Sequence, residues 1–115
     1  MVLVDTSVWV DHLRNGNKLL VSLLEDNEVW LHPFVTGELA CGNLKARDDV
    51  LGLLKKMPQI KKATDDEVLF YIQEQDIAGK GIGYVDAHLL ASVALANDTV
   101  LWTLDKRLAS VAEEL

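Results

Sequence analysis

The fold of this chain is constrained most by short apolar runs that alternate with segments of helical periodicity. Val2–Val4, Val29–Leu31 and Thr99–Thr103 read as strands, and their residues are continuously apolar or β-branched rather than alternating with polar ones. Such runs are typical of strands buried on both faces of a sheet. Ile60 is expected to centre a further, weaker strand. We therefore predict an α/β fold, a three-layer α/β/α sandwich with a central, mostly parallel sheet of four or five strands.

Helical patterns fill the segments between these runs. The sequence predicts helices over residues 8–14, 19–25, 36–43, 48–56, 68–76, 85–96 and 106–114. Pro33 is expected to end the second strand, and Thr64-Asp65-Asp66-Glu67 has the pattern of a capping box before the helix at 68–76. No repeat or linker divides the chain, so residues 1–115 are predicted to form a single domain. The chain stops just after the last predicted helix, where a closing edge strand could follow.

Two acidic residues stand where a strand passes into a helix. Asp5 ends the run Val2–Val4, and Asp105 follows the run Val100–Leu104. In open parallel sheets, functional groups gather outside the carboxyl ends of the strands. Each acid could also simply cap the helix that follows it.

Two further acids fall within apolar stripes of predicted helices. Glu38 shares a stripe with Val35 and Leu39, and Asp86 shares one with Leu89 and Leu90. A carboxylate inside an apolar stripe is costly unless it is paired. A buried Lys or Arg could satisfy either acid alone, but the basic residues of this chain lie mostly outside the stripes.

A shared cation accounts for all four acids together. Four clustered carboxylates would repel one another strongly without a cation or bound protons. Oxygen ligands without Cys or His favour Mg²⁺ or Mn²⁺ over zinc, and such an ion suits phosphoryl chemistry because it activates water and stabilises charge on phosphate. Ser7 and Thr103 are each two residues from a cluster acid, so their hydroxyls could orient a ligand or simply serve a cap or a strand.

The composition of the chain limits the class of protein and the cellular compartment to which it could belong. The formal net charge of −7 argues against a general nucleic-acid coat protein, but not against a nuclease whose acids hold metal. The single cysteine, Cys41, cannot form an internal disulfide, which fits a reducing compartment. No apolar stretch reaches the roughly 20 residues of a membrane span, and no leader peptide is visible. We expect a cytoplasmic protein with no membrane partner.

The ordered acid motifs resemble those of the PIN domain family, and most closely its VapC-type toxins. The motifs are Val-Leu-Val-Asp-Thr-Ser-Val-Trp around Asp5, Thr-Gly-Glu-Leu around Glu38, Tyr-Val-Asp-Ala-His-Leu-Leu-Ala around Asp86 and Leu-Trp-Thr-Leu-Asp-Lys-Arg-Leu around Asp105. The resemblance implies a Mg²⁺- or Mn²⁺-dependent endoribonuclease that blocks translation, is neutralised by a cognate antitoxin and is usually a homodimer. It also implies that Asp5, Glu38, Asp86 and Asp105 hold the metal, with support from Thr103.

Two alternatives from other classes remain open on the residues alone. A receiver-like regulatory domain would accept phosphate on an Asp at a strand end, but Asp5 has no acidic neighbour and Lys106 follows its strand rather than ending it. A catalytically silent binding module of similar α/β fold would be expected to lack one of the acids. All four are present.

Basic residues near the acid motifs are the predicted contacts to RNA. Because the chain is acidic overall, pairing two subunits would concentrate its few cations along one groove. The candidates are Arg14, Lys45, Arg47, Lys106 and Arg107.

Overall fold

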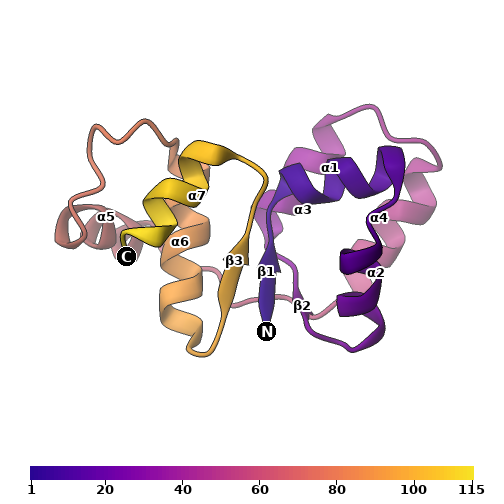
Figure 1. Cartoon of the computed structure of the whole chain (residues 1–115), viewed down its shortest axis with the longest axis horizontal. Coiled ribbons are helices and arrows are strands. Elements are labelled where there is room, and N and C mark those ends of the chain that lie inside the picture. Colours follow the sequence, from indigo (N-terminus) through magenta and orange to yellow (C-terminus); the bar gives the residue numbers. More distant parts are fainter.

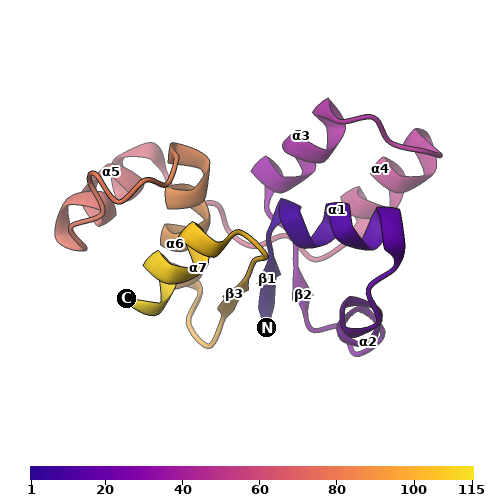
Figure 2. The ribbon, with the colours of Figure 1, turned by 45° about the horizontal axis from the view of Figure 1, so that its top comes forward.

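The computed structural model describes all 115 residues as three strands and seven helices. In chain order the elements are β1 (Val2–Val4), α1 (Thr6–Asn15), α2 (Lys18–Glu25), β2 (Val29–Trp30), α3 (Pro33–Cys41), α4 (Arg47–Lys56), α5 (Asp65–Glu74), α6 (Tyr84–Ala96), β3 (Val100–Trp102) and α7 (Lys106–Glu113). Figures 1 and 2 show the sheet at the centre, with α1–α4 gathered on one side and α5–α7 on the other. The predicted α/β class is confirmed.

The sheet is parallel throughout, in the order β2-β1-β3. The first strand is therefore central, and it pairs Val2 with Val29 on one side and with Val100 on the other. The backbone N–H of Asp5 donates to the carbonyl of Trp102 at 2.9 Å, which carries the β1–β3 pairing to the start of α1. The carboxyl ends of β1 and β3 meet at one edge of the sheet, where α1 and α7 begin (Figure 1).

The prediction of four or five strands is wrong in number. The segment around Ile60 forms only one parallel bridge, between Gln59 and Leu31. Two backbone bonds hold it, from Leu31 N to Pro58 O and from Ile60 N to Leu31 O, each 2.9 Å long. Pro58 has no N–H to donate, which is one reason the pairing does not extend into a ladder.

Two predicted helix boundaries also shift. Pro33 is the first residue of α3 rather than the end of a strand, because its fixed φ and missing N–H are tolerated in a first helical turn. Helix α5 begins at Asp65, three residues before the predicted start, and Thr64 forms a complete capping box with Glu67. The capping-box signal was correct, but it marks Thr64 as the N-cap and so places the helix directly after it.

The largest group of buried side chains lies where the sheet meets its helices. It includes Leu3 and Val4 of β1, Val35 and Leu39 of α3, and Leu89 of α6. Burial of these side chains fixes α3 and α6, the helices that carry Glu38 and Asp86, against the strands. None of the helices has the length and apolar character to cross a membrane.

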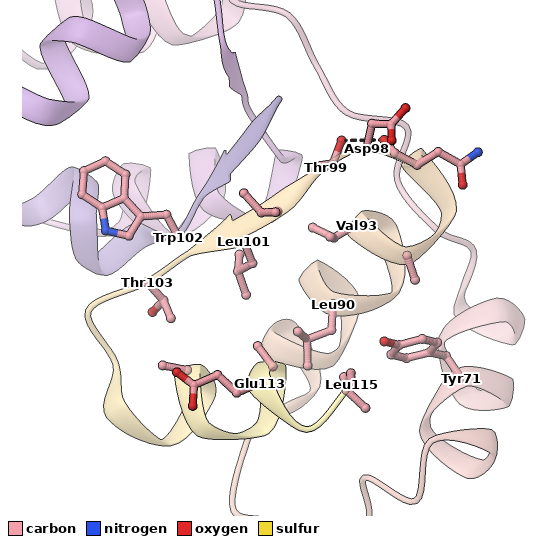
Figure 3. Close-up of a pocket in the computed structure, with 15 residues that line it drawn as sticks. Tyr71, Leu90, Val93, Asp98, Thr99, Leu101, Trp102, Thr103, Glu113 and Leu115 are labelled. Carbon is pink, nitrogen blue, oxygen red and sulfur yellow. Dashed lines mark hydrogen bonds between the residues drawn. The ribbon is translucent and has the colours of Figure 1, made fainter.

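A groove follows the outer edge of β3. It lies between α6, β3 and α7, has a volume of about 630 Å³ and is lined by Leu90, Leu101, Thr103 and Leu115 among others (Figure 3). Strand β3 pairs only with β1, so this side of the sheet is an open edge. Thr103 places one end of the groove next to the acid cluster described below.

Candidate metal and active site

Asp5 is held at the end of β1 by two hydroxyl groups. Its Oδ2 accepts hydrogen bonds from Ser7 Oγ and from Thr103 Oγ1, both at 2.7 Å. The side chain of Asp5 is only 6% exposed, so these charge-assisted bonds compensate for part of the cost of burying a carboxylate. Asp5 also occupies the N-cap of α1, as the capping alternative expected, and accepts weakly from Ser7 N at 3.4 Å.

Thr103 connects Asp5 to Asp105. Its hydroxyl oxygen accepts from the backbone N–H of Asp105 at 3.0 Å while its proton goes to Asp5. Asp105 caps α7 by accepting from Arg107 N at 2.9 Å and from Leu108 N at 3.1 Å, both through Oδ1. The end of β3 and the start of α7 therefore set the positions of both acids.

Glu38 reaches the same region from α3. Its Oε1 accepts from Thr6 Oγ1, the first residue of α1, at 2.7 Å. The expectation that Glu38 lies inside a buried stripe is wrong, because Val35 and Leu39 are buried while Glu38 is exposed. The buried stripe of α3 follows the spacing of Val35 and Leu39, and Glu38 lies at its margin, facing the start of α1.

Asp86 is half-buried in the first turn of α6 and accepts from Gly83 N at 3.3 Å. Burial raises the pKa of Asp86 above its ordinary value, and the bond from Gly83 opposes that rise. The negative charges of Asp5, Asp105 and Glu38 raise the pKa of Asp86 further. The four acids, which are far apart in the sequence, are thus brought within electrostatic range of one another.

Each of the four carboxylates uses one oxygen for the fold and leaves the other free. The oxygens that accept protein hydrogen bonds are Asp5 Oδ2, Glu38 Oε1, Asp86 Oδ2 and Asp105 Oδ1. No ion pair of the structure involves any of the four acids, so a buried Lys or Arg does not explain them. A set of free carboxylate oxygens fits Mg²⁺ or Mn²⁺ in its chemistry.

The side chains as they stand do not form a finished coordination sphere. No three His, Cys, Asp or Glu residues converge closely enough to hold an ion together. Mg²⁺ usually keeps several waters and needs only one or two protein carboxylates, so the donor set fits a hydrated ion. The assignment of these four residues as metal ligands stays a prediction.

A buried histidine network lies beside this region, and sequence spacing did not indicate it. His32 caps α3 by accepting from Phe34 N at Nδ1, so its Nε2 carries the proton and donates to Ser92 Oγ at 3.3 Å. His88 contacts the exposed Asp65 at 3.0 Å, and Tyr84 donates to the same carboxylate oxygen at 2.9 Å. The one signal for His32 in the sequence was its position directly before Pro33, because proline is favoured at the first position of a helix and the residue before it is then the N-cap.

The PIN domain model matches residues 2–114, and the chain therefore belongs to the PIN domain family. Similar proteins include Ribonuclease VapC32 of Mycobacterium tuberculosis, from strain CDC 1551 / Oshkosh and from strain ATCC 25618 / H37Rv. Each is 50% identical to this chain over 114 residues, which is 99% of this chain and 92% of the relative. The resemblance predicted from the acid motifs is confirmed, and a receiver-like domain is not favoured.

Proposed function

We propose that this protein is a Mg²⁺- or Mn²⁺-dependent endoribonuclease that hydrolyses phosphodiester bonds of RNA and acts as the toxin of a toxin–antitoxin pair. The observation that carries the proposal is the set of four acids whose second oxygens point to no protein donor. The same activity is supported by the relatives from Mycobacterium tuberculosis, which are VapC ribonucleases 50% identical to this chain. Such an enzyme would act in the cytoplasm, where its RNA is.

In this proposal Asp5, Glu38, Asp86 and Asp105 would hold the ion. They come from four different places in the fold, the end of β1, α3, the first turn of α6 and the N-cap of α7. With Mg²⁺ or Mn²⁺ bound by these residues, a metal-bound water would be available as nucleophile and negative charge on the attacked phosphate would be offset. Ser7 and Thr103 keep the second oxygen of Asp5 directed away from their hydroxyls, because both donate to Oδ2. Thr6 and Gly83 fix Glu38 and Asp86 in the same way. The protein's part is therefore to fix the position of each oxygen before the ion and the substrate arrive.

Cleavage of a defined RNA pool tests the activity. We expect the purified protein to cut RNA with Mg²⁺ or Mn²⁺ and to stop when a chelator is added. Asp5→Asn and Asp105→Asn should remove cleavage, whereas Asp48→Asn, an exposed acid in the first turn of α4, should not. Sequencing the new 5′ ends would identify the cut site. Undiminished cutting by Asp5→Asn would refute the assignment of the site.

A cognate antitoxin is the proposed protein partner. Its presence is supported by the VapC name of the relatives, since VapC-type toxins are neutralised by such partners. We expect growth arrest when this protein is induced alone and recovery when a neighbouring antitoxin gene is induced with it. Growth arrest that no co-induced partner relieves would contradict a toxin–antitoxin pair.

A homodimer is the proposed assembly. Helices α5 and α6 expose Leu69, Phe70 and Leu95 with 58%, 67% and 55% of their areas accessible, and Phe70 and Leu95 line one hollow. Exposed apolar patches of this kind favour protein contacts. Light scattering should give a mass of two chains for the wild-type protein and a mass of one chain for the Phe70→Asp variant. Monomeric wild-type protein with full cleavage activity would exclude a required dimer.

A further inference from the structure

Two hollows with basic residues in their linings lie beside the acid cluster, one at α1 and α3 and the other at α7, and these helices lie on opposite sides of β1 (Figure 1). The first has a volume of about 340 Å³ and lies between α1 and α3, with Glu38, Arg14 and Lys45 in its lining. The second has a volume of about 880 Å³ and lies on α7, with Asp105, Lys106 and Arg107 in its lining. Each hollow therefore contains one acid of the cluster. The first has two cations in its lining and the second has three, of which Lys80 is paired with Glu114 in the same lining.

The four cations of these rims are free to bind a ligand. Arg14, Lys45, Lys106 and Arg107 are exposed, and none of them takes part in an ion pair. Other basic residues nearby are already used. Arg47 donates to the carbonyls of Ala40 at 2.6 Å and Gly42 at 3.3 Å, and Lys80 is paired with Glu114.

The guanidinium of Arg107 also has a defined position. It lies against the backbone of Gly81, where an added Cβ would come within 2.6 Å of Nη1 and 2.8 Å of Cδ. Gly81 belongs to the loop that leads to Asp86 in α6. Contact with this loop restricts the side chain before any ligand binds, so less conformational entropy is lost on binding.

We propose that one RNA strand runs from the first hollow to the second across the acid cluster, with its phosphates bound by Arg14 and Lys45 on one side and by Lys106 and Arg107 on the other. The proposal rests on the proposed ribonuclease function and adds the path of the substrate to it. Phosphates require cations, and the acid cluster itself repels RNA until metal is bound. Placing cations on each side of the cluster would hold the strand so that a phosphate between them lies next to the ion bound by the four acids. Arg47 is removed from the predicted set of RNA contacts.

Matched double substitutions test this path. Arg14→Gln/Lys45→Gln and Lys106→Gln/Arg107→Gln each remove two positive charges, as does the control Lys55→Gln/Lys56→Gln. The control lysines are exposed in the last turn of α4, about 15 Å along the helix from its start. Binding is measured by fluorescence anisotropy with a random-sequence pool of single-stranded RNA, in an Asp5→Asn background that prevents cutting. Each variant is compared with its Asp5→Asn parent, so that a loss of metal affects both equally. Cleavage of the same pool is measured in the wild-type background.

Each rim variant should weaken binding by about tenfold or more. It should reduce the magnitude of the slope of log K against log salt by about 1.4, because two phosphate contacts are lost at about 0.7 each on a single strand. It should also raise KM with a smaller change in kcat, because these residues bind the strand rather than the reacting atoms. The control should leave all three quantities close to the parent values. Thermal denaturation checks that each variant is folded, and Lys106→Gln alone, which keeps the Arg107 contact with Gly81, provides a milder change on the same rim.

The outcomes separate this path from the proposed function. A wild-type protein that cuts no RNA with either metal would contradict the function itself. A wild-type protein that cuts RNA while both rim variants match the control would overturn the path and leave the function standing. Equal losses in all three double variants would also overturn it, because net charge rather than position would then explain binding.

Discussion

At the scale of single residues, the hydroxyl groups of Ser7 and Thr103 determine how Asp5 is oriented. Each hydroxyl has one proton, and each is 2.7 Å from Asp5 Oδ2. Each oxygen also accepts a backbone N–H, from Leu104 and Asp105 respectively, at 3.0 Å. The 3.2 Å contact between the two hydroxyls is therefore left without a proton of its own. Two side chains that are 96 positions apart thus hold the same oxygen of the Asp5 carboxylate by hydrogen bonds.

The Thr103→Val substitution should distinguish the effect of the Thr103 hydrogen bonds from the effect of its packing, because valine keeps the shape of the side chain and lacks the hydroxyl. It removes one of the two hydroxyl groups that donate to the buried carboxylate of Asp5, so we expect a loss of about 1–3 kcal/mol in the free energy of unfolding together with a marked fall in cleavage. Thr103→Ser keeps both hydrogen bonds and should retain activity. Denaturant titrations and cleavage assays of both variants provide the measurement. Equal activity of the two variants would show that the hydroxyl has no role.

Asp86→Asn should stabilise the metal-free protein at neutral pH. The pKa of Asp86 is raised in the folded state, so this group lowers stability as pH rises from its ordinary pKa through the raised one. Asparagine removes that charge and can still accept from Gly83 N. We expect a higher Tm than wild type at pH 7 in chelator, a difference that shrinks at acidic pH, and no cleavage. A lower Tm at pH 7 would instead indicate a structural acid with a lost partner.

At the scale of secondary-structure elements, a buried polar network joins α3, α6 and the segment before α5. Ser92 on α6 accepts from His32 at the start of α3 and from the backbone N–H of Ala63 at 3.1 Å. Both His32 and Ser92 are fully buried. The network fixes α6, and with it Asp86, relative to the helix that carries Glu38.

This network should make the fold sensitive to acid. Burial, followed by the neighbouring charges of His88 and Lys62, lowers the pKa of His32 from 6.5 to about 4. The unfolded chain then binds a proton that the folded one does not, so stability should fall by up to about 3 kcal/mol as pH drops from 6.5 to 4. His32→Asn, which can still cap α3, should flatten this part of the pH profile. Denaturant unfolding between pH 4 and 7 would measure it, and an unchanged profile would assign the acid sensitivity elsewhere.

Some features of these elements could be predicted from the sequence and others could not. Asp5 and Asp105 could be predicted at the ends of strands, because the end of each apolar run marks the end of a strand. Parallel pairing then places the carboxyl ends of both strands at the same edge of the sheet. The partnership of His32 with Ser92 was not predictable, because 60 residues separate them and no spacing rule connects them. The weak strand at Ile60 was overestimated because its apolar character was read without the missing donor of Pro58.

At the scale of the whole molecule, the net charge is −7, and four of the acidic residues that contribute to it lie within electrostatic range of one another. Their repulsion is tolerated in the metal-free protein because one oxygen of each is hydrogen-bonded, but it lowers stability. An ion that binds only the folded cluster would relieve it and would add the free energy of binding to that of folding.

Mg²⁺ or Mn²⁺ should therefore raise Tm relative to a chelator, by an amount that grows with the metal concentration. Zn²⁺ should not be specifically required, since the donor set is all oxygen. Calorimetry with each ion tests this, and Asp5→Asn should abolish the increase while Asp48→Asn should not. Absence of any shift up to millimolar Mg²⁺ and Mn²⁺ would count against a preformed site.

The position of β1 between β2 and β3 has a consequence for synthesis of the protein. The amino-terminal strand leaves the ribosome first, yet one of its two neighbours is the last strand of the chain to be made. The hydrogen bond between Asp5 and Thr103 spans 98 positions, and Asp105 follows only two residues later. A nascent chain that lacks β3 has neither Thr103 nor Asp105, so it cannot assemble the acid cluster. On the proposed assignment of the four acids, the ribonuclease site can therefore form only after β3 and the start of α7 have been made.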